Sequence, residues 1–242
     1  MKTFGLLLML LLPTAMLAQM GSAFAELPTM LLPDTVDEVD LAELPMTVIT
    51  QFEYLRLEGK SGASVVAAPA MKPDSPGVFV VRTANPSFEF QETNEYEGSY
   101  QYLGLVPEVR SHMIVFCGEG MCETYLLDHE TDDKLTLPAD YDAGVMDLLL
   151  SPAKDRMLVC SSYDGPDYTN YYAHRAMVVL YRITKGQGLA GLLPLRVIVM
   201  DDRSIERVVW KDDRTLALKT YAGARWGEGV EEGYAYFSVV VE

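Results

Sequence analysis

The residues best suited to recognition chemistry lie in one tyrosine-rich loop, residues 163–175, between two short apolar runs. Its side chains combine flat apolar rings with polar edges, a composition that is enriched at binding surfaces. The loop predicts contact with a protein, a peptide or a glycan, although its tyrosines could instead pack over a sheet edge or the core. The residues expected to make this contact are Tyr163, Asp164, Asp167, Tyr168, Tyr171, Tyr172, His174 and Arg175.

A glycine-rich stretch, residues 221–229, offers a second exposed candidate. It carries Arg225 and Trp226 between glycines, which favour a mobile backbone. We expect these two side chains to extend the surface formed by the tyrosine-rich loop.

Catalysis has weaker support than binding. The chain has no Gly-x-Ser-x-Gly motif, and its three histidines, His112, His129 and His174, have no partner at a spacing typical of a catalytic set. Asp164 and Asp167 leave one alternative open, a carboxylate-dependent hydrolase of the periplasm. The favoured hypothesis is a noncatalytic binding or scaffold protein.

An acidic turn at residues 128–133 gathers the carboxylates of Asp128, Glu130, Asp132 and Asp133. Calcium prefers such oxygen ligands, but the turn lacks the register of an EF-hand loop. A solvated turn is therefore the favoured interpretation, with calcium as the alternative. The cysteines and histidines do not form a zinc pattern, and we expect no other cofactor or metal.

The three cysteines are Cys117, Cys122 and Cys160. The first two flank a glycine-rich turn of four residues, and a hairpin there would bring their sulfur atoms across from each other. We expect a disulfide between Cys117 and Cys122 in an oxidising compartment. Free thiols or a bridge to Cys160 remain alternatives.

The first 25 residues predict export. Lys2 precedes an apolar run, and Ala23-Phe24-Ala25 has the small-x-small pattern of a signal-peptidase site. We expect cleavage near Ala25-Glu26, no stable membrane insertion afterwards, and a periplasmic or secreted protein. The formal net charge of −16 argues against nucleic acid as a partner, because phosphate binding requires basic side chains.

Residues 26–45 form an acidic segment that contains three prolines. Composition favours a flexible arm. The alternative is that the segment docks through apolar side chains such as Leu41 and Leu44.

The rest of the chain, residues 46–242, predicts a single all-β domain. Short runs rich in β-branched and aromatic residues end at Gly, Pro, Asp or Asn, and no long segment has a helical period. The expected strands are residues 48–57, 64–68, 78–82, 88–91, 100–106, 113–117, 124–128, 145–150, 157–162, 177–183, 196–200, 205–210, 215–220 and 234–241. This pattern fits a sandwich, a barrel or a propeller.

One internal repeat refines that choice. The motif Asp155-Arg156-Met157-Leu158 recurs as Asp213-Arg214-Thr215-Leu216, and a looser version starts at residue 105. Each copy predicts a strand, a charged turn and a second strand, which is how propeller blades repeat in sequence.

The stretch Ser151-Pro152-Ala153-Lys154-Asp155 resembles the Ser-Pro-Asp-Gly turn of many β-propeller blades, from which it departs at Ala153 and Lys154. The resemblance implies a propeller-like fold, and the length allows about four blades of about 40 to 50 residues. A partial or open propeller and a twisted β-sandwich are the alternatives. An open form leaves sheet edges free, which allows a third functional class, an assembly subunit completed by a partner's strand.

Overall fold

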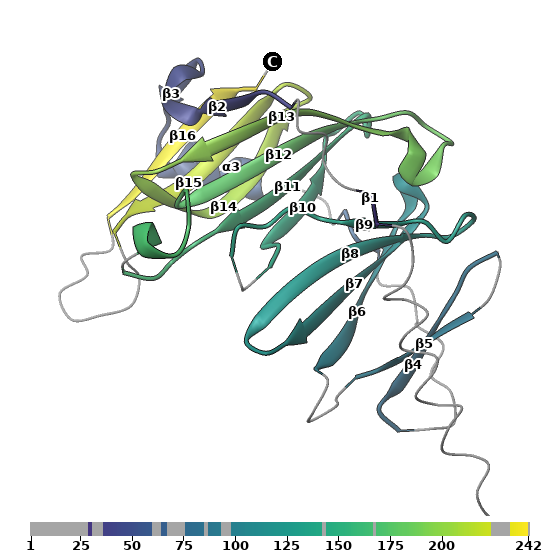
Figure 1. Cartoon of the computed structure of the whole chain (residues 1–242). Helices are drawn as coiled ribbons and strands as arrows, with labels where there is room; N and C mark the ends of the chain where they lie inside the picture. The colour runs from purple at the N-terminus through teal and green to yellow at the C-terminus, as the bar shows by residue number, and fades with distance from the viewer. Residues whose placement is uncertain are drawn as a thin grey trace, which may run out of the picture.

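The computed structural model describes residues 29–30, 36–59, 64–66, 76–84, 87–92, 98–141, 144–166, 168–223 and 233–241. The prediction of an all-β protein is confirmed, because three antiparallel sheets and a separate hairpin hold most of these residues (Figure 1). The hairpin pairs β4 (Val78–Arg82) with β5 (Ser87–Gln91).

Each of the three sheets is built from strands that follow one another along the chain. The first sheet contains β6 (Ser99–Val106), β7 (Ser111–Gly118), β8 (Met121–Asp128) and β9 (Lys134–Thr136). The second contains β10 (Asp147–Leu150), β11 (Arg156–Ser162), β12 (Ala176–Ile183) and β13 (Leu192–Met200). The third contains β14 (Arg203–Asp212), β15 (Thr215–Ala222) and β16 (Tyr234–Val240).

The sheets pack face to face because their strands are apolar on both faces. On β12, Val178 packs into the core shared with the third sheet, whereas its neighbour Val179 packs into the core shared with the first sheet. The hairpin covers the outer face of the first sheet, where Phe79 and Phe90 pack with Ile114. The resulting order of layers is hairpin, first sheet, second sheet and third sheet. The described sheets do not close into a ring, so the arrangement does not establish the blades of a propeller.

The acidic segment is docked where the structure describes it. Its strands β1 (Thr29–Met30) and β2 (Glu38–Asp40) pair with β9 and β13, and the following strand β3 (Met46–Val48) pairs with β16. Each extends the last strand of one sheet, and Figure 1 shows the purple β2 and β3 beside β13 and β16. A short turn of 3-10 helix, η1 (Leu41–Glu43), buries Leu41 between the second and third sheets. The expectation of a flexible arm is corrected here, because edge pairing and apolar burial hold the segment.

The prediction of one strand over residues 48–57 is wrong, because a helix, α3 (Gln51–Glu58), follows β3. Thr50 and Glu53 form a capping box in which the Glu53 N–H donates to Thr50 Oγ1 at 3.2 Å and the Thr50 N–H donates to Glu53 Oε2 at 2.8 Å. This reciprocal cap satisfies amides that the first helical turn leaves free. The helix buries Tyr54 against the outer face of the third sheet, which ends the stack of layers.

The disulfide between Cys117 and Cys122 is confirmed. The two residues are register partners on β7 and β8, with a Cα separation of 4.1 Å. Glu119 and Gly120 lie between these strands with φ angles of +52° and +84°, as a tight hairpin turn of right-handed twist requires. Cys160 is a buried free thiol.

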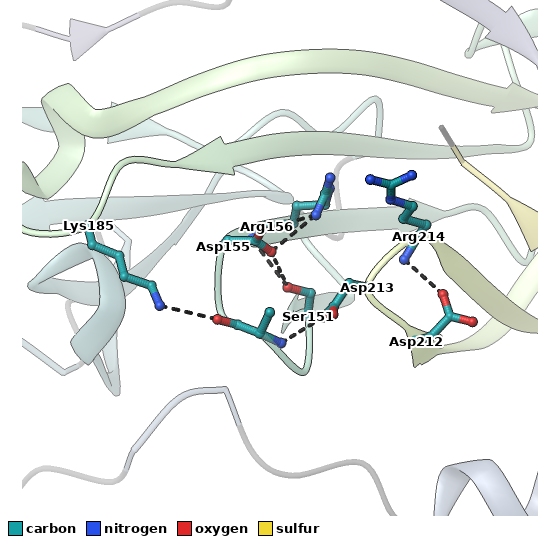
Figure 2. A network of polar contacts seen from close by, with 8 residues as sticks. Ser151, Asp155, Arg156, Lys185, Asp212, Asp213 and Arg214 are labelled. Carbon is teal, nitrogen blue, oxygen red and sulfur yellow. Dashed lines mark hydrogen bonds and ion pairs between the residues drawn. The ribbon is translucent and has the colours of Figure 1, made fainter.

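The repeated turns lie side by side, as Figure 2 shows for Ser151, Asp155 and Asp213. The Ala153 N–H, in the β10–β11 turn, donates to Asp213 Oδ1 in the β14–β15 turn at 2.6 Å. Lys154 pairs with Glu108, which lies in the β6–β7 turn. The corresponding turns of all three sheets therefore occupy one end of the molecule and contact one another in sequence.

Candidate binding surface

The tyrosine-rich loop connects β11 to β12 and contains one turn of 3-10 helix, η3 (Tyr168–Asn170). Its two ends are tied together, because the Tyr163 N–H donates to the Arg175 carbonyl at 2.9 Å. The Arg175 N–H in turn donates to the Met200 carbonyl on β13 at 2.9 Å. The loop is thus a direct extension of the hydrogen bonding of the second sheet.

Arg175 anchors the loop from inside. Only 5% of its surface is exposed. Its guanidinium donates to Ser204 Oγ at 3.1 Å, to the Gly223 carbonyl at 3.0 Å and to the Gly165 carbonyl at 3.2 Å. The same group lies 4.7 Å from the centre of the Tyr168 ring, within the range of a cation–π contact. The structure therefore places Arg175 beneath the predicted surface as its support.

Three tyrosines form a packed cluster behind the loop. The Tyr163 and Tyr172 rings are 4.9 Å apart, and Tyr141, from the β9–β10 connection, lies edge-on to Tyr172 at 4.7 Å. The Tyr141 hydroxyl donates to the His174 carbonyl at 2.6 Å, and burial raises the pKa of Tyr141 far above its ordinary value. For these rings the alternative interpretation, packing over the edge of a sheet, describes what the structure contains.

Tyr171 differs from this cluster because 77% of its surface is exposed. Its ring lies 6.3 Å from that of Tyr172, which joins it to the packed rings. An exposed aromatic ring on a fixed backbone can be buried by a partner at low entropic cost, because the loop is already ordered.

His174 lies beside the tyrosines in an acidic setting. Its Nδ1 is 2.7 Å from Asp201 Oδ1, and its Nε2 is 3.5 Å from Glu38 Oε1 on the docked strand β2. Burial raises the pKa of the neighbouring Asp140; His174 opposes this rise and Glu38 adds to it. The rim of the surface is therefore polar and carries several carboxylates.

The structure brings together Tyr163, Tyr168, Tyr171, Tyr172, His174 and Arg175 from the predicted set, with Asp164 partly exposed in the same loop. Asp167, Arg225 and Trp226 lie outside the described residues. Gly223, which precedes the last two by two and three positions, contacts Arg175 through its carbonyl.

Sequence reasoning missed the long-range members of the surface. Tyr141, Asp201 and Glu38 come from separate segments, and nothing in their local sequence marks them. The pairing of β2 with β13 places Glu38 near His174, so only the register of the sheet reveals that contact.

The acidic turn uses its carboxylates internally. Asp128 accepts hydrogen bonds from the backbone N–H groups of Glu130 at 2.8 Å, Thr131 at 3.1 Å and Leu189 at 2.8 Å. Glu130 pairs with Arg110. Within the described part of the chain, no group of three or more His, Cys, Asp or Glu side chains is arranged to hold a metal ion.

No protein-family model matches this chain, and no curated protein sequence matches it. Among the residues that the structure describes, no helix has both the length and the apolar character needed to span a membrane.

Proposed function

We propose that this protein is an exported, noncatalytic binding protein that recognises a protein, peptide or glycan through the loop of residues 163–175. One observation carries the proposal: Tyr171 is exposed on a loop that the buried Arg175 fixes through four different groups. Rigid scaffolds that present ordered loops are common binding sites.

The surroundings of His174 favour binding over the hydrolase alternative. Its two ring nitrogens face the carboxylates of Asp201 and Glu38, both of which are more than half exposed. A histidine that activates a nucleophile instead needs one nitrogen directed at that nucleophile.

Export is supported by the disulfide between Cys117 and Cys122, because such bonds persist in oxidising compartments. The cleavage near Ala25-Glu26 lies outside the described residues and stays part of the proposal.

The finer architecture that we propose is an open propeller of three blade-like sheets. Its support is the contact between equivalent turns, Glu108 with Lys154 and Ala153 with Asp213. Lys154 also has a φ of +57°, the left-handed conformation that favours the glycine of the Ser-Pro-Asp-Gly turn.

The function is tested by capture of partners from the native envelope with the purified protein as bait. A partner recognised by this loop should be captured by the wild type and by Met121→Ala, and lost with Tyr171→Ala. Met121 is the matched control because it is an exposed apolar residue on another sheet. A partner captured equally by all three proteins would contradict the assignment of the site.

A further inference from the structure

The outer edge of the third sheet carries a strand with no charged side chain. This strand, β3, consists of Met46, Thr47 and Val48, and all three residues are exposed. Val48 is 75% exposed and Met46 is 42% exposed. Two more large apolar side chains, Phe52 and Leu55, are exposed on the helix that follows. Exposed apolar groups gathered in this way mark an interaction site.

The neighbouring edge strand provides a contrast. On β2, Glu38 and Asp40 are charged and exposed. Charged side chains on edge strands are a common protection against pairing with another chain, because a second strand would have to bury them. Since β3 lacks that protection, it is the edge at which pairing costs least.

The hydrogen bonds of β3 define which of its backbone groups are directed outward. The Ile49 N–H donates to the Tyr236 carbonyl at 3.0 Å, and the Pro45 carbonyl accepts from the Val240 N–H at 3.0 Å. Because backbone groups alternate in direction along a strand, Thr47 also faces β16. The N–H and C=O groups of Met46 and Val48 therefore point away from the sheet.

These outward groups are symmetric about Thr47. If β3 of a second copy lies antiparallel on a two-fold axis through Thr47, Met46 of each copy faces Val48 of the other. Each such pair can exchange two N–H to carbonyl hydrogen bonds, as antiparallel ladders require. Met46 and Val48 project from the same face of the strand, so each exposed side chain also gains an apolar neighbour across the axis.

We propose that β3 is a homodimerisation edge, at which two copies of this chain join their third sheets into one continuous sheet with Thr47 on the two-fold axis. The occupant is a second copy because the register is self-complementary, as a two-fold interface must be. The net charge of −16 opposes association, so the dimer should form more readily as salt screens the repulsion.

Sedimentation equilibrium of the purified protein at low and at physiological ionic strength tests the proposal. The wild type should show a monomer–dimer equilibrium whose dissociation constant falls as salt is added. Val48→Lys places a charge on the edge and should raise that constant at least about tenfold. Leu193→Lys, which charges an exposed apolar position on β13, should leave it unchanged.

Disulfide trapping with Thr47→Cys gives a second readout that does not depend on Val48→Lys folding. Thr47 faces its symmetry mate as a non-hydrogen-bonded pair, with Cα atoms about 4.5 Å apart, close enough for a bridge. Mild oxidation should link the Thr47→Cys chains into a dimer and leave Leu193→Cys chains monomeric. A protein that stays monomeric at all concentrations and salts, or a dimer that Thr47→Cys does not trap, would overturn the proposal. A strand from a different protein on the same edge would leave the purified chain monomeric and would overturn it equally.

Discussion

Asp213 accepts a hydrogen bond from the backbone N–H of Ala153 at 2.6 Å, which joins two turns that the sequence marks as copies of each other. Each turn connects the first two strands of its own sheet, and the two sheets pack face to face. The internal repeat therefore has a structural meaning: the same hairpin is used in consecutive layers, and its charged turn holds the next layer in place.

Removing this inter-turn bond should destabilise the fold modestly. Asp213→Ala leaves the Ala153 N–H to water, and we expect the free energy of unfolding to fall by about 1 kcal/mol. Chemical denaturation measures this change. Asp202→Ala removes a more exposed carboxylate with only a 3.6 Å ion pair and should change stability by less than about 0.5 kcal/mol. Equal losses for the two variants would show that the contact between turns contributes nothing.

The left-handed backbone at Lys154 predicts a stabilising effect of glycine. Lys154→Gly and Lys154→Ala both remove the ion pair with Glu108, so their difference isolates the cost of a side chain at a φ of +57°. We expect the glycine variant to be more stable than the alanine variant by about 1 kcal/mol. Thermal and urea unfolding of both proteins provide the comparison. An alanine variant as stable as the glycine variant would contradict the assignment of this turn.

Arg175 should matter for stability whereas Tyr171 should not. Arg175→Lys keeps the charge but cannot donate to Ser204, Gly223 and Gly165 together, so we expect a loss of about 2 to 4 kcal/mol in unfolding free energy. Tyr171→Ala removes an exposed ring and should cost less than about 0.5 kcal/mol. Urea denaturation distinguishes the two. A large loss for Tyr171→Ala would mean that the ring supports the fold and is not kept free for a partner.

His112 predicts a loss of stability toward acid. Burial, with His129 as the next cause, lowers the pKa of His112 below its ordinary value of 6.5. The unfolded chain then binds a proton that the folded chain refuses, so the free energy of unfolding should fall as the pH drops below 6.5 and level off past the folded pKa.

Two measurements check this prediction. An NMR titration should give His112 a lower pKa than a histidine in an unfolded peptide, and urea denaturation between pH 7.5 and 5.5 should reveal the slope. His112→Gln keeps a polar side chain near Tyr102 and should flatten the slope. A slope unchanged in this variant would assign the acid sensitivity to other groups.

Local patterns in the sequence were sufficient for much of the fold. The hairpin with Cys117 and Cys122 was predictable because a glycine-rich turn between apolar runs sets its own register. The strand predictions in the second and third sheets succeeded because long apolar runs bounded by turn residues have few other uses.

Features that depend on distant partners were not predictable. The acidic segment has a composition typical of disorder, yet its strands fill edges of sheets whose positions the local sequence cannot reveal. Helix α3 was missed because its apolar residues suggested a strand, although the capping pair Thr50 and Glu53 was present in the sequence. In the candidate surface, Tyr141 and Asp201 reach the loop only through packing of separate segments.

Photocrosslinking from position 171 tests the central claim most directly. A photoreactive phenylalanine analogue at Tyr171, introduced into the protein in its native cells, should give a specific crosslinked partner. The same analogue at Met121, another exposed site, should not give that product. Absence of any product from position 171, or identical products from both positions, would contradict a binding role for the loop that Arg175 anchors.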